Sequence, residues 1–335
     1  MSRPILLALC LLCPSTITMA EILRITAITA PATPWHDGWV HFEQQLNRKE
    51  TLDLQARFYL QGQLGSEESA LSQLRRGRVQ LGGFSLQGAS AVVPELGLLM
   101  SPFLFRSFEE VDFVMDNYLL QAFHQLFAEK GLVLLSWAEV GWTSVYAQTP
   151  LLTPEVAQGL KLRSSNALAS QLLIQSVGAD MVPMAFPDIL PSLQTGLIDG
   201  GESGAILYAL TGLPRAAPHL TLTRHAFDTG MYLANRDWFM QLTPAQQAHL
   251  RASLMPAPEF RRLVRDYEAR ILSHPEQHGI LLHQPDAEQL AAWQRATAGN
   301  RSALAAAIGG KSPQISDLLQ RGRGAFAAQQ RAAGL

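Results

Sequence analysis

Hydrophobic positions near the start of the chain follow two alternating periods. Apolar residues recur at every second position over residues 21–27 and 52–60, as in strands, and with helical spacing over residues 34–46. The same patterns then predict a helix over 66–77, a strand over 79–84, a helix over 107–130 and a strand over 132–137. Because helices and strands keep alternating, we expect an α/β fold with a mostly parallel sheet covered on both faces.

The later pattern predicts a second domain and a hinge. Residues 138–148 form an extended crossing, and a second β-α-β series runs from residue 161 to about residue 224. A strand at 227–235 and a long helix at 257–272, which spans the hinge, return the chain to its first domain. We assign residues 21–140 and 229–270 to domain I, and residues 141–228 and 271–335, with the C-terminal helices, to domain II.

Length and composition support two domains and disfavour one class of partner. The 335 residues exceed the usual size of a single core, and a hydrophobic content of 47% is ample for two. The 26 basic and 28 acidic residues nearly balance, which leaves no electrostatic footprint for nucleic acid. We expect no nucleic-acid partner.

The first twenty residues have the layout of a cleavable secretory signal peptide. Arg3 precedes a leucine-rich run at 5–12, and small residues end the segment at Ala20. Both cysteines, Cys10 and Cys13, lie inside residues 1–20, so a mature chain beginning at Glu21 contains none. The apolar run is too short to span a bilayer, and we expect a soluble exported protein.

Arg163 stands at the end of a strand-like run, about forty residues before the glycine-rich stretch 200–204. A guanidinium is planar and always charged, and its donors match the two oxygens of a carboxylate. This pairing suggests a carboxylate pocket. The alternative is a strand-end arginine on the surface or in a structural ion pair.

Seven short motifs spread along nearly all of the mature chain occur in the same order as in one known protein family. They are Pro34-Trp35, Gly62-Gln63-Leu64-Gly65, Pro94-Glu95-Leu96-Gly97, Pro102-Phe103-Leu104-Phe105, Gly159-Leu160-Lys161-Leu162-Arg163, Pro183-Met184-Ala185-Phe186 and Leu193-Gln194-Thr195-Gly196-Leu197-Ile198-Asp199-Gly200. On these motifs the chain resembles the DctP-type periplasmic solute-binding proteins of tripartite ATP-independent periplasmic (TRAP) transporters.

The resemblance implies a two-domain periplasmic binding protein with mixed sheets flanked by helices and a cleft between the domains. It implies a periplasmic subunit that captures an organic acid by pairing its carboxylate with an arginine and closing around it. Small and large integral membrane subunits would receive the ligand, driven by ion gradients rather than ATP. We expect a monomer with no cofactor.

In the family an arginine on the strand matching Lys161-Leu162-Arg163 holds the ligand carboxylate, and Arg163 occupies that position. Where many members have a second arginine this chain has Thr143, and Ser203 replaces a common asparagine. The departure at Thr143 argues against dicarboxylate and sialic-acid ligands, and we expect a different monocarboxylate. The hydroxyl of Ser203 remains a donor, with a shorter reach than an amide.

Four aromatic residues, Trp35, Trp142, Tyr146 and Phe186, are candidates for the rest of the pocket wall. Trp142 beside Thr143 would suit a monocarboxylate with an apolar or aromatic body. Each of these aromatic residues has the alternative of an ordinary place in the core.

Ser85 and Gln87 follow the predicted strand at 79–84, where an open α/β sheet presents its ligands. Their alternative role is hydrogen bonding within a turn. Glu202 is a further candidate, since a cation bridging it and the ligand carboxylate remains open.

An enzyme is the rival class. Gly201-Glu202-Ser203-Gly204 resembles a nucleophile elbow, but the second glycine comes one place too early for G-x-S-x-G. His219 and His225 are expected to be structural, so we predict no catalytic residue. No zinc-type spacing occurs at His36, Asp37 and His41, and no metal site is predicted. A ligand sensor for a signalling partner would use the same cleft, and the sequence leaves this alternative to transport open.

Overall fold

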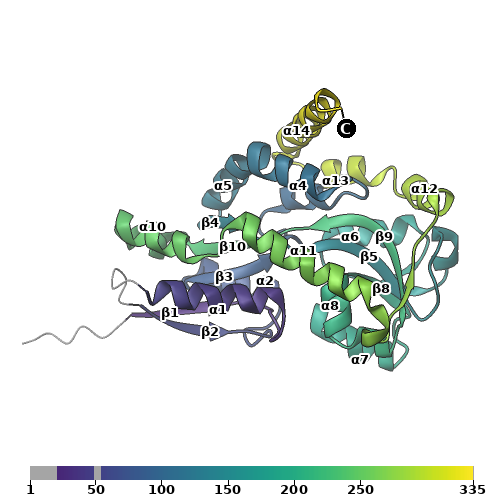
Figure 1. Cartoon of the computed structure of the whole chain (residues 1–335), viewed down its shortest axis with the longest axis horizontal. Helices are drawn as coiled ribbons and strands as arrows, with labels where there is room; N and C mark the ends of the chain where they lie inside the picture. The colour runs from purple at the N-terminus through teal and green to yellow at the C-terminus, as the bar shows by residue number, and fades with distance from the viewer. Residues whose placement is uncertain (1–20, 49–53, 335) are drawn as a thin grey trace, which may run out of the picture.

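The computed structural model describes residues 21–48 and 54–334 and contains two β-sheets. The strands of the first sheet are β1 (Glu21–Thr26), β2 (Leu54–Tyr59), β3 (Leu81–Ser85), β4 (Leu132–Trp137) and β10 (Gly230–Asn235). They lie in the order β2-β1-β3-β10-β4, with β10 antiparallel to both neighbours (Figure 1).

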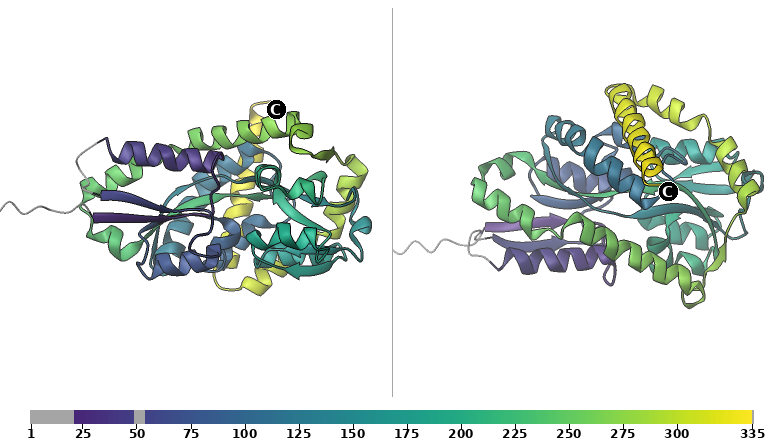
Figure 2. Two further views of the ribbon diagram at one scale, coloured as in Figure 1. Left: turned by 90° about the horizontal axis from the view of Figure 1, so that it is seen from below. Right: turned by 45° about the horizontal axis from the view of Figure 1, so that its top comes forward.

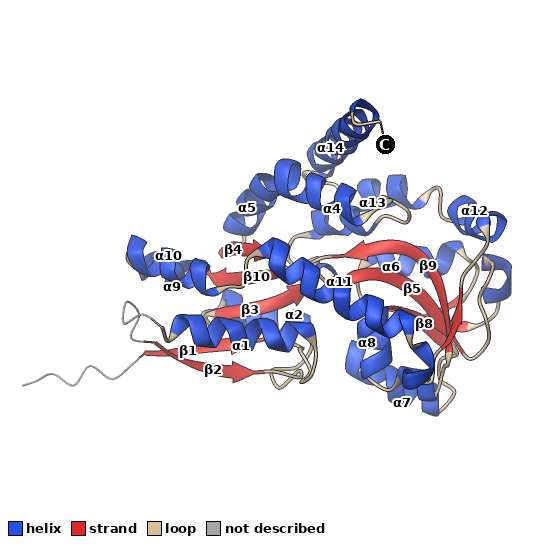
Figure 3. Ribbon diagram, in the orientation of Figure 1, coloured by secondary structure: helices blue, strands red, loops and turns tan. Residues whose placement is uncertain are grey.

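The strands of the second sheet are β5 (Gly141–Ala147), β6 (Lys161–Ser164), β7 (Asp180–Pro183), β8 (Gly200–Gly204), β9 (His219–Asp228) and β11 (Leu281–His283). Their order is β11-β9-β5-β8-β6-β7, and β5 is antiparallel to β8 and β9. Both sheets are therefore mixed, and helices flank them (Figure 3).

Helices and short helical turns connect these strands. Before β5 they are α1 (Pro34–Leu46), α2 (Glu67–Arg75), α3 (Leu86–Ala89), η1 (Pro94–Met100), α4 (Phe108–Val114), η2 (Met115–Leu119) and α5 (Leu120–Glu129). Between β5 and β10 they are η3 (Pro154–Ala157), α6 (Leu168–Ser176), η4 (Phe186–Asp188), α7 (Ile189–Gln194), α8 (Ala205–Leu210) and η5 (Leu213–Arg215). After β10 they are α9 (Arg236–Gln241), α10 (Pro244–Ser253), α11 (Ala257–Ser273), η6 (Pro275–His278), α12 (Ala287–Ala296), α13 (Asn300–Ile308) and α14 (Ser312–Ala332).

Polar side chains cap the starts of several helices. The Ser66 hydroxyl accepts a hydrogen bond from the backbone of Ser69 at 3.3 Å and starts α2. Thr243 and Gln246 form a reciprocal capping box at the start of α10. The predicted helix at 107–130 is confirmed as α4, η2 and α5, with a π-helical turn at η2.

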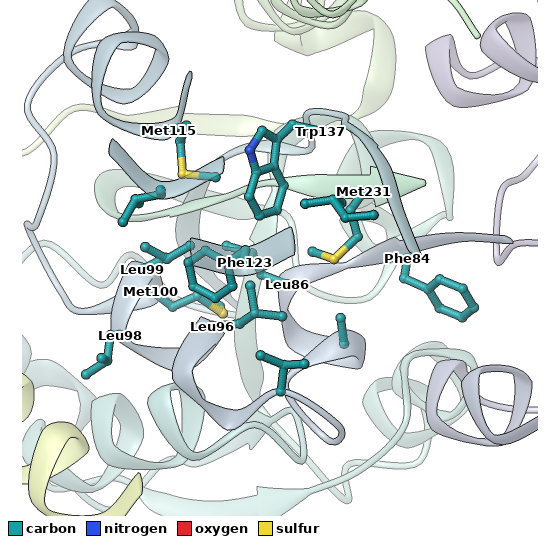
Figure 4. Packing of buried hydrophobic residues seen from close by; sticks show 14 of the residues in the cluster. Phe84, Leu86, Leu96, Leu98, Leu99, Met100, Met115, Phe123, Trp137 and Met231 are labelled. Carbon is teal, nitrogen blue, oxygen red and sulfur yellow. The ribbon is translucent and has the colours of Figure 1, made fainter. Parts of the chain in front are cut away.

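Strand β10 shows why its sequence is apolar at nearly every position. Met231 and Leu233 belong to one hydrophobic core, while Tyr232 and Ala234 belong to another. Successive side chains point to opposite faces, so a strand covered on both sides needs no polar alternation. In the first core, the rings of Phe123 and Trp137 meet edge to face at 5.7 Å (Figure 4).

The prediction of one strand over residues 227–235 is wrong, because the structure divides this segment between two strands. β9 ends at Asp228 in the second sheet and β10 begins at Gly230 in the first, so the chain crosses between sheets at Thr229. Because both strands are buried and extended, their hydrophobic pattern continues through Thr229 and does not reveal the crossing. The crossing pairs with the 138–140 segment, because Ala138 N–H donates to Gly230 O at 2.7 Å and Val140 N–H to Asp228 O at 3.1 Å.

Helix α11 runs alongside both sheets and is held by ion pairs near the crossing (Figure 1). Arg265 donates to both carboxylate oxygens of Asp112, at 2.9 and 2.6 Å, and to both of Glu139, at 2.8 and 2.7 Å. Arg261 makes a two-pronged contact with Asp116 at 2.7 Å. The network joins α11 to α4 and to the first crossing segment.

The C-terminal helices do not stay with one sheet. α12 contacts η3, α13 contacts α6 and η1, and α14 packs against α4 and η2. Figure 2 shows the yellow C-terminal helix beside blue helices from the first half of the chain. Phe326 of α14 meets Phe113 at 5.7 Å. α14, which the sequence prediction places with residues 271–335 in domain II, thus contacts helices that precede β5. The domain bounds stay a prediction. Among the described residues, no helix is both long and apolar enough to cross a bilayer.

We predict that Arg265→Ala lowers the free energy of unfolding by about 3 kcal/mol, because it leaves the buried Glu139 without its partner. Burial already raises the pKa of Glu139, and losing the arginine raises it further. Protonation at lower pH removes the buried charge, so the penalty should be smaller at pH 5 than at pH 8.

Urea unfolding at both pH values measures this effect. Arg321→Ala, which breaks a well-exposed pair with Asp317 on α14, is the matched control and should show no comparable loss. An equal penalty at pH 5 and pH 8 would contradict the role assigned to Glu139.

Candidate functional site

A cavity of about 150 Å³ lies where the two sheets meet and is lined by residues of both. The first sheet and its loops contribute Trp35, Glu67, Ser85 and Gln87 to the lining, among others. The second sheet and its loops contribute Thr143, Arg163, Phe186, Glu202 and Ser203. The cavity therefore brings together eight of the ten residues predicted from the sequence for the site, all except Trp142 and Tyr146.

Arg163 is buried in the second sheet, with 5% of its surface exposed. Its Nε and Nη2 donate to the backbone carbonyl of Met184 at 3.2 and 3.1 Å. Among the described residues, no carboxylate comes within 4.0 Å of its guanidinium. Burial lowers the pKa of Arg163, opposed by nearby Tyr146 and Glu202, but an arginine remains charged in this setting.

Gly201 of β8 gives Arg163 its room. A Cβ on Gly201 would come within 3.1 Å of the Arg163 Cβ and 2.9 Å of the Tyr146 hydroxyl. A side chain there would collide with the strand that carries the arginine. Gly201 is thus a packing requirement of the site.

Glu202 and Ser203 follow Gly201 on β8. The Glu202 Oε2 lies 2.9 Å from the His225 Nε2, and the His225 Nδ1 lies 2.8 Å from the Thr223 hydroxyl. Burial favours the neutral acid, but the hydrogen bond and attraction of His225 outweigh it and lower the pKa of Glu202. The Ser203 hydroxyl donates to the Gly204 carbonyl at 3.2 Å.

Ser85 and Gln87 lie in the lining at the corner between β3 and α3. The Ser85 N–H and hydroxyl donate to the two oxygens of Glu67 at 2.8 and 2.7 Å. The same hydroxyl caps α3 by accepting from the Gly88 N–H at 3.1 Å. Ser85 therefore has the turn-bonding role as well as a place in the cavity wall.

Trp35 and Phe186 approach the cavity from opposite domains. The indole N–H of Trp35 donates to the Glu139 carbonyl at 2.7 Å, which ties α1 to the first crossing segment. Phe186 belongs to η4 and is only partly buried.

Trp142 and Tyr146 do not line the cavity, which corrects the sequence prediction. Trp142 packs edge to face on Phe227 at 5.0 Å, inside a hydrophobic core. Thr143 takes the cavity-facing place, so the alternation of the strand turns Trp142 to the opposite face. Tyr146 packs on Tyr208 at 5.1 Å instead.

The cavity also contains acidic residues that the sequence analysis missed, namely Glu67, Glu68 and Asp228. Glu67 and Glu68 stand in the first turn of α2, where acidic residues favour a helix N-terminus, and this ordinary role concealed them. Asp228 ends β9 at the crossing between the sheets, and no local motif marks it. The Asp228 Oδ1 accepts from the Leu86 N–H at 3.1 Å.

The arrangement suits binding better than catalysis. The Ser203 hydroxyl donates to backbone, and His225 lies between Glu202 and Thr223 rather than beside a serine or cysteine. Within residues 21–48 and 54–334, no cluster of three metal-ligating side chains occurs.

Comparison with known proteins identifies the family. The model of bacterial extracellular solute-binding protein, family 7 (DctP), matches residues 25–302. The chain belongs to this family. DctP-family proteins are periplasmic binding proteins of transport systems, and the family predicted from the seven sequence motifs is confirmed.

Relatives with known sequences agree with this assignment. A solute-binding protein of Chromohalobacter salexigens is 30% identical over 212 residues, which are 63% of this chain and 63% of that protein. The 2,3-diketo-L-gulonate-binding periplasmic protein YiaO of Escherichia coli is 25% identical over 78% of this chain and 80% of its own.

Solved structures match the fold of this DctP-family protein over most of its length. A TRAP periplasmic solute-binding protein from Sulfitobacter with bound β-D-galacturonate has a TM-score of 0.83 and 28% identity, covering 91% of this chain and 100% of that one. One from Roseobacter denitrificans with bound β-D-glucuronate has a TM-score of 0.84 and 25% identity, covering 90% and 99%. The DctP-family protein described here is thus a periplasmic solute-binding protein of the TRAP type.

We predict that Trp142→Ala lowers the free energy of unfolding by about 3–5 kcal/mol, because it opens a hole between Phe108 and Phe227 in the core. Phe186→Ala removes an aromatic ring of the cavity wall that is only partly buried, and should be clearly milder. Denaturant unfolding of both variants checks the pair. A smaller loss for Trp142→Ala than for Phe186→Ala would contradict the core position of Trp142.

Proposed function

We propose that this TRAP solute-binding protein captures an organic monocarboxylate and that Arg163 anchors the carboxylate. One observation carries the proposal: Arg163 is buried at the cavity and no described carboxylate lies within ion-pair distance. A desolvated guanidinium is unfavourable without an anion, and a bound carboxylate supplies one. By contrast, Arg261 and Arg265 are satisfied by acidic side chains of the protein itself.

The anchor is one arginine, which supports a single carboxylate. Arg163 is the one basic side chain in the described lining, and the lining has Thr143 at the position where, from the family resemblance, many members have a second arginine. The aromatic body first inferred from Trp142 loses its support, since Trp142 lies in the core. The uronates bound by the Sulfitobacter and Roseobacter proteins are monocarboxylates with hydroxylated rings, and they are reasonable first probes.

Domain closure follows from where the contacts lie. The ligand would touch Arg163 and Ser203 on the second sheet and Trp35 and Ser85 on the first. A ligand that contacts both domains favours the closed arrangement by the sum of those contacts. The crossings at 138–140 and 228–230 are the segments that a hinge motion would bend.

In this proposal the protein binds its ligand without chemical change and delivers it to the small and large membrane subunits of a TRAP transporter. It works as a monomer in the periplasm after export. The signal peptide expected at residues 1–20 lies outside the described residues.

We predict that Arg163→Met reduces the affinity for the monocarboxylate ligand by at least about 2 kcal/mol, since it removes the desolvated charge partner. The variant should keep its stability or gain some, because a buried charge without a protein partner is replaced by an apolar chain. A thermal-shift screen of unfolded and refolded protein with mono- and dicarboxylates identifies the ligand, and calorimetry compares the variants.

Arg24→Met is the control for charge, because it removes an exposed arginine outside the cavity. Its affinity should equal that of the unaltered protein. Undiminished affinity in Arg163→Met would overturn the anchor, and a thermal shift with dicarboxylates alone would overturn the monocarboxylate assignment.

A further inference from the structure

We propose that the ligand is a zwitterion whose cationic nitrogen is held by Asp228, with Glu67 beside it, while its carboxylate binds Arg163. This inference rests on the proposed function, because the carboxylate end is the one that Arg163 anchors. The inference adds that the end of the ligand opposite the carboxylate is cationic, and it names Asp228 as the residue that selects ligands with a cationic nitrogen.

The first argument is the balance of charge around the cavity. Its described lining contains four carboxyl side chains, those of Glu67, Glu68, Glu202 and Asp228, and one basic side chain, Arg163. His225 pairs with Glu202, and the other carboxyl groups have no such basic partner within 4.0 Å among the described residues. A plain monocarboxylate would bring one more negative charge into this wall, whereas a zwitterion brings none in sum.

The second argument is the geometry of Asp228. Its side chain is 5% exposed and its Oδ1 accepts one hydrogen bond, from the Leu86 N–H at 3.1 Å. Its Oδ2 has no hydrogen-bond partner among the described residues, and the residue lines the cavity. One backbone donor does not compensate a buried carboxylate, which normally has two or three donors or a cation.

The surroundings of Asp228 increase its need for a cation. The titratable groups that act on it are Glu67 from α2 and Glu202 from β8, both acidic. Burial and then these neighbours raise the pKa of Asp228 well above its ordinary value, and burial also raises the pKa of Glu67. In the absence of a cation, protonation relieves the repulsion between the buried Asp228 and the half-buried Glu67. A protonated ligand nitrogen would take the place of those protons.

A cationic nitrogen suits this corner better than a sugar hydroxyl. A hydroxyl offers one hydrogen bond but leaves two neighbouring carboxylates uncompensated. A protonated amine or amidine donates to Asp228 Oδ2 and also neutralises charge, and such charge-assisted hydrogen bonds are the stronger ones. Glu67 already uses both oxygens on Ser85, so Asp228 has the oxygen available for the direct contact.

Calorimetry with matched ligands tests the inference. The probes are proline against cyclopentanecarboxylate and 4-aminobutyrate against pentanoate, with ectoine, D-galacturonate and D-glucuronate as further ligands. We expect at least one zwitterion to bind at least about tenfold more tightly than the matched carboxylate that lacks the amine. The same zwitterion should also bind more tightly than either uronate. Binding of the uronates with no binding of any zwitterion in the panel, or no binding at all, would overturn it.

Two variants separate this inference from the proposed function. Asp228→Asn should remove the preference for the zwitterion, with a loss of about tenfold or more, while retaining an acceptor for the Leu86 N–H. Glu95→Gln is the control, because Glu95 is a buried carboxyl outside the lining that accepts from the Lys311 N–H. If Arg163→Met abolishes binding but Asp228→Asn changes nothing, the zwitterion fails and the carboxylate anchor stands.

The pH dependence gives an independent readout. A cation that displaces a proton from Asp228 should release that proton, so affinity rises with pH, by up to about tenfold per pH unit below the pKa of the free site. Calorimetry in two buffers of different ionisation enthalpy would then show proton release, which Asp228→Asn removes. Affinity that falls as pH rises would mean that a protonated Asp228 donates to a ligand oxygen, and the inference would be wrong.

Discussion

The buried guanidinium of Arg163 is the constraint on which the site depends. A charge in this position must be compensated, and the protein supplies the Met184 carbonyl but no carboxylate within 4.0 Å among the described residues. Gly201 of β8 leaves room beside the arginine, and the lining of the cavity comes from both sheets. The site is therefore incomplete in a physical sense until an anion with matching geometry binds.

The hinge region shows the opposite arrangement, in which charges are satisfied within the protein. Arg261 and Arg265 of α11 bind Asp112, Asp116 and Glu139, and the two crossing segments pair with each other. Asp228 lies in both regions, because it ends β9 at the crossing and lines the cavity. In the proposed domain closure, a ligand contact at Asp228 would act directly on one of the two crossing segments.

Much of the secondary structure could be predicted because its signals are local. Ser66 and Thr243 cap helices through contacts within one turn, and the helix at 107–130 follows from its own periodicity. Arg163 was found through family motifs and its place after a strand. Trp142 was assigned to the cavity because a strand pattern gives alternation but not which set faces the ligand, and the structure gives that face to Thr143.

The sequence by itself determined the α/β class and the family, and it singled out Arg163 as the proposed anchor, because each of these rests on local periodicity or on contiguous motifs. Only the tertiary structure decided that one apolar run divides at Thr229 between two sheets and that α14 packs on α4. It alone placed Glu67 and Asp228 in one cavity with Arg163. Residues 67, 163 and 228 are far apart along the chain, and their shared electrostatic environment exists only after the sheets and the crossing bring them together.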